Sequence, residues 1–158
     1  MQKINGATII FDFGFLVLAW YFMTEKELKN KTKVVAISVA RLCQKLVANK
    51  INNTYIDQIL RSSASMGANY RAACRAKSTK DFIYKLQVVE EEADETMLFL
   101  ELLAEFNEKQ KPEMRALYKE TEVILKMIVA SIKTSQTKHA VEAVKESKIK
   151  NRKSKINE

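Results

Sequence analysis

Residues 79–106 read TKDFIYKLQVVEEEADETMLFLELLAEF, and this stretch decides the fold class. Its apolar residues recur every three or four positions, which places them on one face of a helix. They are Phe82, Leu86, Val89, Ala93, Met97, Leu100 and Leu103. Just before them, Ser78-Thr79-Lys80-Asp81 supplies an N-cap and an acidic first turn. We therefore predict a long amphipathic helix that ends near Phe106 and buries this stripe in a core.

The preceding segment predicts another helix, from about Tyr55 to Ala76, with Thr54 as its N-cap. Its small residues form a low-profile face, and such a face lets two helix axes approach closely. They are Ser63, Ala64, Gly67, Ala68 and Ala72. A glycine inside a helix costs about 1 kcal/mol relative to alanine, so Gly67 needs a packing reason. We expect close packing at Gly67, Ala64 and Ala68, with this helix inside an assembly.

One more helix is predicted on each side of this pair. The first runs from Glu25 or Asn30 to about Ala48 and carries Val35, Val39, Leu42 and Leu46, before residues 49–53 break the pattern. The last follows a connector at residues 107–111, has Pro112 in its first turn, and carries Met114, Leu117, Thr121, Ile124, Ile128 and Ile132. Short connections imply antiparallel neighbours. Residues 23–135 are therefore predicted to form an all-α, up-down-up-down four-helix bundle.

The composition of the 158 residues agrees with one helical domain without catalytic chemistry. Three glycines and one proline supply little turn chemistry, which disfavours a sandwich or barrel of many short strands. The one histidine, His139, lies in a polar tail, so no His-based metal cluster or nucleophile–histidine pair is expected. Cys43 and Cys74 lack CxxC spacing and are interpreted as buried thiols in a reducing cytoplasm. We predict no enzyme activity, no metal and no cofactor.

The net charge of +8 is concentrated near the end of the sequence. Residues 133–158 hold eight basic and three acidic residues, a net charge of +5. A basic tail suits polyanions such as nucleic acid, but a solvated, disordered segment has the same composition. The apolar period fades beyond Ser135, although Ala140, Val141 and Val144 are able to extend the last helix by a few turns. Residues 136–158 are therefore predicted to be a basic, disordered tail.

Residues 1–22, MQKINGATIIFDFGFLVLAWYF, form a strongly apolar extension. A secretory signal is disfavoured because the segment lacks a basic start and a small-x-small cleavage site. A membrane span is disfavoured because Asp12 and Gly14 interrupt an apolar run that is already short. The favoured interpretation is that Met23 is the working start, since a polar, helix-like segment follows at once. If the extension is made, its aromatic residues need burial in a groove on the bundle or against a partner.

Five basic residues form the candidate nucleic-acid-binding set: Arg61, Arg71, Arg75, Lys77 and Lys80. The three arginines fall within about 80 degrees of one another on a helix wheel, and the lysines follow at the helix junction. Repeated around a ring of subunits, the set would bind phosphates by neutralising their charge. The alternative is that Arg71 and Arg75 pair with the acids of residues 90–95 on the antiparallel helix, across a helix or a subunit interface. Tyr70 and the other aromatics are expected in the core or at a subunit interface.

The stretch from Ile59 to Leu103 closely resembles the 23S rRNA intervening-sequence proteins. The specific pieces are Arg61-Ser62, then Ala64-Ser65-Met66-Gly67-Ala68-Asn69-Tyr70-Arg71-Ala72-Ala73-Cys74-Arg75-Ala76-Lys77-Ser78, then Asp81-Phe82-Ile83, and then Glu90-Glu91-Glu92-Ala93-Asp94-Glu95. The resemblance extends from about Leu28 to Lys133 and leaves out residues 1–22. It implies a left-handed four-helix bundle that assembles as a ring, usually a pentamer, and it brings no settled biochemical activity.

The same resemblance implies a distant similarity to the accessory variability determinant of diversity-generating retroelements, a basic pentamer that contacts nucleic acid and a reverse transcriptase. We therefore expect a bacterial, cytoplasmic, non-enzymatic homo-oligomer that binds RNA or DNA weakly and without base specificity. The alternative is a protein-binding adaptor that recruits a partner, such as a reverse transcriptase or a ribosome-associated factor, without binding nucleic acid. No small-molecule substrate is expected.

Overall fold

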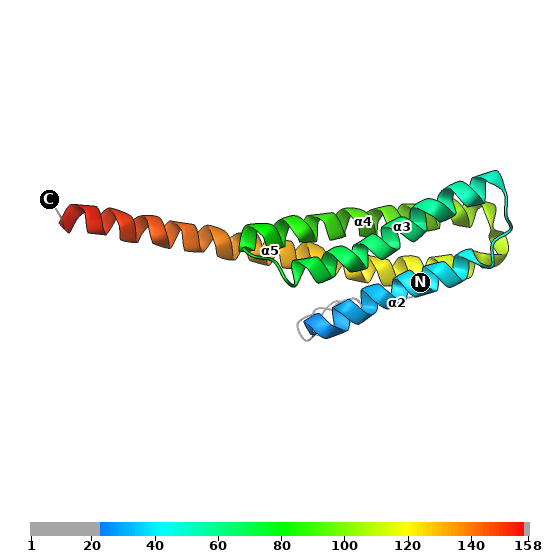
Figure 1. Ribbon diagram of the computed structural model, residues 1–158, viewed down its shortest axis with the longest axis horizontal. Helices are drawn as coiled ribbons and strands as arrows, with labels where there is room; N and C mark the ends of the chain where they lie inside the picture. The colour runs from blue at the N-terminus through cyan, green and yellow to red at the C-terminus, as the bar shows by residue number, and fades with distance from the viewer. Residues whose placement is uncertain (1–22, 157–158) are drawn as a thin grey trace, which may run out of the picture.

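The computed structural model describes residues 23–156, which form four long helices and no strand (Figure 1). The helices are α2 Glu25–Cys43, α3 Lys50–Ala73, α4 Thr79–Phe106 and α5 Lys111–Ile156, with a short 3-10 helix, η1 Glu108–Gln110, before α5. Successive helices run antiparallel, and α5 also packs against α2. The predicted all-α class and four-helix bundle are confirmed.

Side-chain caps set the starts of three helices. At α2, the Thr24 hydroxyl accepts the Glu27 N–H at 3.2 Å, and the Glu27 carboxylate accepts the Thr24 N–H at 2.6 Å. This reciprocal pair is a capping box, which satisfies two N–H groups that the helix leaves free. Ser78 caps α4 by accepting the Asp81 N–H at 3.1 Å, as the sequence predicts.

Three predicted helix boundaries in the first half of the chain are wrong. Helix α3 begins at Lys50 because the Asn49 side chain accepts the Asn52 N–H, so Thr54 lies inside the helix and donates to the Lys50 carbonyl. Helix α2 ends at Cys43, short of Ala48. The next residues form tighter turns that return Leu46 to the core. Helix α3 likewise ends in such turns, at Ala73.

The core is built from the stripes that the sequence indicates. On α4 the stripe residues from Leu86 to Leu103 are buried, and Phe82 is half-buried against them. On α5 the six predicted positions are all buried: Met114, Leu117, Thr121, Ile124, Ile128 and Ile132. Val35, Val39 and Leu42 of α2 are fully buried as well. Burial of such side chains stabilises the fold by roughly 1.5–3 kcal/mol each.

Two asparagines join the α2–α3 connection to the end of α4. The Asn52 amide donates to the Asn107 side-chain oxygen at 3.0 Å, and the Asn107 amide donates back at 2.9 Å. Each amide also donates to a backbone carbonyl at 2.8 Å, that of Val47 from Asn52 and that of Leu103 from Asn107. Because Asn52 is 1 % exposed, these bonds satisfy an amide that water does not reach. They hold two connections together at this end of the bundle.

Helices α2 and α3 approach each other closely at Gly67. A Cβ built there would lie 3.6 Å from the Thr32 hydroxyl oxygen and 3.7 Å from the Thr32 Cβ, which is ordinary van der Waals contact. This contact lies within one chain and leaves room for a methyl group, so it gives no reason for glycine in place of alanine, and the close packing predicted at Gly67 stays a prediction about an assembly. Ala64 and Ala68 are exposed on the outer side of α3. Close packing at these two alanines stays a prediction about an assembly.

The contact at Gly67 has room for one methyl group but no larger side chain. We expect Gly67→Ala to raise the free energy of unfolding by about 0.5–1 kcal/mol, because alanine restricts the unfolded chain and favours the helix. Gly67→Leu should instead lower it, because the longer side chain meets Thr32. Urea unfolding followed by circular dichroism measures both variants. A destabilised alanine variant would contradict the geometry.

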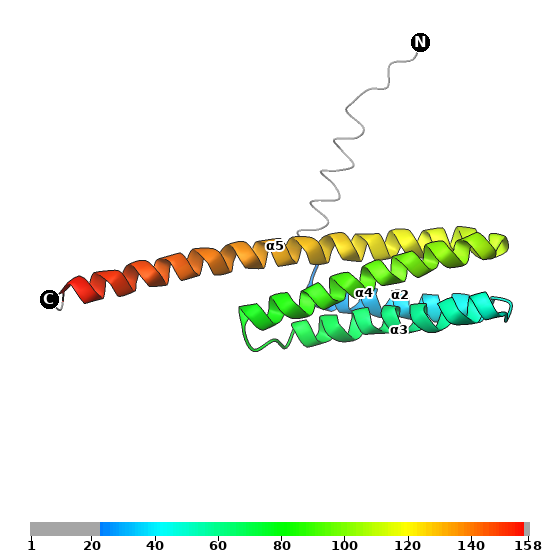
Figure 2. The same ribbon diagram turned by 90° about the horizontal axis from the view of Figure 1, so that it is seen from above.

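The predicted disorder of residues 136–158 is wrong for the residues that the structure describes. Helix α5 continues to Ile156 and projects beyond the other helices as a single extension (Figure 2). Neither glycine nor proline follows Pro112, and Ala, Lys and Glu favour helix, so a helix nucleated on the bundle propagates. Described side chains from Gln136 to Lys145 are exposed. None of the described helices carries an apolar stretch long enough to span a bilayer.

Candidate nucleic-acid interface

Arg61, the first of the five predicted basic residues, is engaged in ion pairs. Its guanidinium lies 2.5 Å from a Glu95 carboxylate oxygen and 3.6 Å from one of Glu92, so it joins α3 to α4. The hydrogen bond and charge of Glu95 raise the pKa of Arg61. The pairing that the sequence left open for Arg71 and Arg75 therefore occurs at Arg61. This arginine is less available to phosphates than the other four residues.

Arg61 stands at the edge of a polar seam between α3 and α4. Ser65 donates to the Glu92 carboxylate at 2.8 Å, and Thr96 donates to the Ser62 hydroxyl at 3.0 Å. Ser62 and Thr96 are fully buried, so their hydroxyl groups need these partners. Sequence reasoning missed this seam and placed Glu92 only in an acidic run. The seam sets the axial register of the two helices.

That register explains why Arg71 and Arg75 do not reach the acidic run. Glu92 lies level with Ser65, and residues 71 and 75 lie roughly 9 and 15 Å further along α3 at about 1.5 Å per residue. Both arginines are exposed, and neither forms an ion pair with the described residues. Within one chain, their predicted pairing with the acids of α4 is wrong.

Arg71, Arg75, Lys77 and Lys80, here called the basic quartet, gather where α3 ends and α4 begins. All four side chains are exposed, and residues 71–80 contain no acid. The nearby Asp81 is already occupied, because it accepts the Lys77 N–H at 3.0 Å and pairs with Lys85 at 3.1 Å. These contacts lower the pKa of Asp81. The quartet is therefore a patch of uncompensated positive charge.

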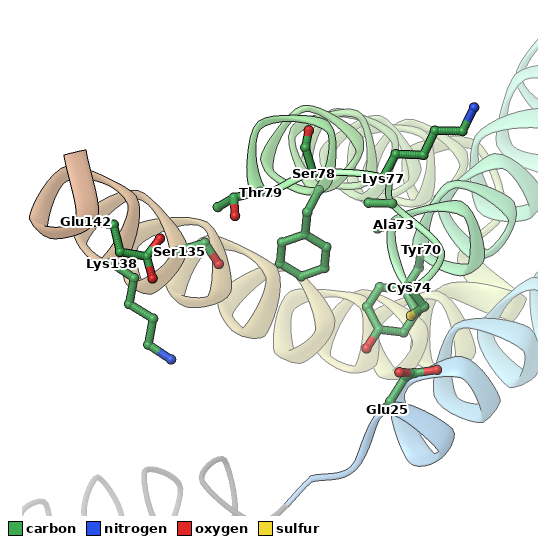
Figure 3. A pocket seen from close by; sticks show the side chains of 12 residues that line it. Glu25, Tyr70, Ala73, Cys74, Lys77, Ser78, Thr79, Ser135, Lys138 and Glu142 are labelled. Carbon is green, nitrogen blue, oxygen red and sulfur yellow. The ribbon is translucent and has the colours of Figure 1, made fainter. Parts of the chain in front are cut away.

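Helix α5 leaves the bundle beside the quartet. A pocket of about 600 Å³ lies between the α3–α4 connection and α5, and Lys77 and Lys138 extend away from its centre on opposite sides (Figure 3). Glu25 and Glu142 also line this pocket, and Glu25 is paired with Lys29. Lys133, Lys138 and Lys145 are exposed on α5. The extension thus adds basic side chains at the end of the bundle that carries the quartet.

The opposite charge lies further along the bundle. Residues 90–108, which cover most of α4 and its end, hold eight acidic residues and no basic one. Helix α4 runs from the quartet toward the far end of the bundle, so these acids lie away from the quartet along the bundle axis (Figure 2). The positive charge of the quartet attracts a negatively charged partner to that end of the molecule.

The described residues contain no metal-ligand cluster and no activated thiol. No group of three or more His, Cys, Asp or Glu side chains among them is placed to bind a metal ion. Burial raises the pKa of Cys43 to about 11, and burial also raises the pKa of Cys74. The thiolate is the nucleophilic form of cysteine, and a raised pKa reduces the fraction of thiolate at neutral pH. His139 is exposed on the α5 extension.

Comparison with known proteins identifies the family. The sequence profile of the 23S rRNA-intervening sequence protein family matches residues 24–130. This chain belongs to that family. The match covers α2, α3, α4 and the bundled part of α5, so the basic quartet lies inside the matched region. The resemblance seen in the sequence is confirmed.

A solved structure agrees with the assignment. It is the crystal structure of a protein of unknown function from the S23 ribosomal protein family of Bacteroides thetaiotaomicron, with 33 % sequence identity and a TM-score of 0.64. The similarity covers 70 % of this chain and 99 % of that chain. The comparison with curated proteins found no match to this chain.

Proposed function

We propose that this protein is a non-enzymatic, cytoplasmic homo-oligomer that binds structured RNA or DNA through the basic quartet. The observation that carries the proposal is the set of four exposed cations that form no ion pair among the described residues. Contacts of lysine and arginine with phosphates supply affinity but do not distinguish one base sequence from another. The expected ligand is therefore a folded nucleic acid recognised by its backbone.

An oligomer accounts for apolar surface that a single chain leaves in water. Val34 and Ile37 of α2 are each 43 % exposed, and Leu60 of α3 is 37 % exposed. The small residues Ala64 and Ala68 lie on the same outer side of α3 as Leu60. A ring of identical subunits, with five as the expected number, would cover these residues. It would also repeat the quartet around one end and increase the number of phosphates contacted.

The binding experiment is a titration of a labelled RNA hairpin at about 50 mM and about 200 mM salt, with light scattering to count subunits. Four phosphate contacts predict an affinity that falls by about a hundredfold between these concentrations. Hairpins of unrelated sequence should bind equally. An affinity that does not change with salt, or an absence of binding at the lower concentration, would sink the proposed mechanism.

A second candidate function is that of a protein-binding adaptor. An aromatic patch that lies away from the quartet favours this function. Tyr55 of α3 packs against Phe99 and Phe106 of α4, with ring centroids 6.0 and 6.3 Å away. Phe106 is 54 % exposed and Leu98 is 49 % exposed. An exposed aromatic patch suits a protein partner, such as a reverse transcriptase or a ribosome-associated factor. If Phe106→Asp abolished recruitment of a partner while RNA binding was absent, the adaptor would replace the first proposal.

A further inference from the structure

Beside the quartet, two adjoining pockets form one open groove at the end of the bundle, here called the end groove. The pocket described above has a volume of about 600 Å³, and its neighbour about 350 Å³. Tyr70, Phe82 and Ser135 line both pockets, so the two are continuous. All four helices contribute to the walls, because α2 and α4 begin here, α3 ends here and α5 passes by.

The smaller half of the end groove has an apolar floor. Leu28, Tyr70 and Met127 lie at the edge of the core, and Met23 and Phe82 are half-buried against it. Ser131, Thr134 and Ser135 of α5 form a polar margin. Apolar surface left in water is unfavourable in proportion to its area. An apolar occupant would recover part of this free energy.

The geometry of the α2 start directs the preceding chain to this groove. Thr24 is the N-cap of α2, so Met23 and Leu28 occupy the N′ and N4 positions of a hydrophobic staple. Both residues line the smaller pocket. The capping box holds Thr24 in an extended conformation and so sets the angle at which the chain enters α2. The chain that precedes α2 is therefore covalently joined to a residue, Met23, that lines the groove.

We propose that the segment Leu16–Phe22 occupies the end groove. Its sequence, LVLAWYF, carries no charge and ends in three aromatic side chains. A fully buried aromatic side chain removes roughly 150–250 Å² from water, so these residues match an apolar floor. Their direct attachment to Met23 makes the binding intramolecular, with a high effective concentration. The proposal does not depend on nucleic-acid binding.

The chain contains its own reporter for this inference. Trp20 is the one tryptophan, and three residues of extended chain place it within about 10 Å of Met23. In the full chain we expect a blue-shifted Trp20 emission and slow quenching by acrylamide. Ala130→Glu with Thr134→Glu puts two carboxylates into the groove and should shift the emission to that of tryptophan in water. Ala116→Glu with Thr137→Glu, at exposed positions of α5 outside the groove, should leave it unchanged.

A proximity measurement covers the case in which the groove variant does not fold. In a Cys43→Ser, Cys74→Ser chain, a nitroxide on Thr134→Cys should quench Trp20 strongly. One on Ala116→Cys, 18 residues or about 27 Å away along α5, should not. Equal quenching from both sites would overturn the proposal. So would water-like emission in the full chain, a blue shift that appears only at high protein concentration, or one that appears only with lipid vesicles.

Discussion

Replacing the basic quartet with glutamate, as Arg71→Glu, Arg75→Glu, Lys77→Glu and Lys80→Glu together, is expected to weaken RNA binding by on the order of a thousandfold or more. The four substitutions remove the phosphate contacts and put negative charge in their place. Each lost contact also lowers the slope of log affinity against log salt concentration by about one unit. All four side chains are exposed, so the fold should persist. Fluorescence anisotropy with a hairpin RNA measures the loss, and circular dichroism checks the fold.

The matched control replaces four other exposed basic residues with glutamate, and these residues lie toward the far end of the bundle. Lys50, Lys109, Arg115 and Lys119 are exposed, form no ion pair among the described residues, and give the same change in net charge. This control should retain most of the affinity. An equal loss in both variants would mean that net charge, and no particular surface, attracts the RNA. The basic quartet would then have no special role.

Asn52→Asp is expected to lower the free energy of unfolding by about 3 kcal/mol or more. The carboxylate cannot donate to the Asn107 side-chain oxygen or to the Val47 carbonyl, and it would be buried with charge against these two acceptors. Thermal and urea unfolding at neutral pH measure the effect. At acid pH, where the new group is protonated and donates one hydrogen bond, part of the stability should return.

Asn53→Asp is the control for this prediction. Asn53 is the next residue along α3 and is exposed, so the same substitution should change the stability by less than about 0.5 kcal/mol. A double-mutant cycle with Asn52→Ala and Asn107→Ala should give a coupling of about 1–2 kcal/mol. If the changes in unfolding free energy of the two single variants simply added in the double variant, the reciprocal amide hydrogen bonds would contribute nothing to stability.

The helices and the core could be predicted from sequence because their signal is local. The stripe on α4 repeats every three or four residues, and such a repeat reveals a buried face without knowledge of the partner. The ends of the helices were harder to predict from sequence. Asn49 and Thr54 are both acceptable N-caps, and the choice of Asn49 accompanies the long-range bond of Asn52, two residues inside the helix, to Asn107.

The candidate site was only partly predictable, for a different reason. The five basic residues could be named, but their pairing depends on the axial register of α3 against α4. That register is set by Ser62 with Thr96 and Ser65 with Glu92, contacts between residues about thirty positions apart. A shift of two turns would have placed Arg71 beside the acids in place of Arg61. The α5 extension was missed because composition alone does not show that a nucleated helix continues.

The basic quartet and the exposed lysines of α5 concentrate positive charge at the end of the bundle that holds the α3–α4 connection. A polyanion at a distance of one or two Debye lengths is therefore drawn toward this end before the surfaces meet. Orientation before contact shortens the search for the docked pose, so added salt should slow association more than it speeds dissociation.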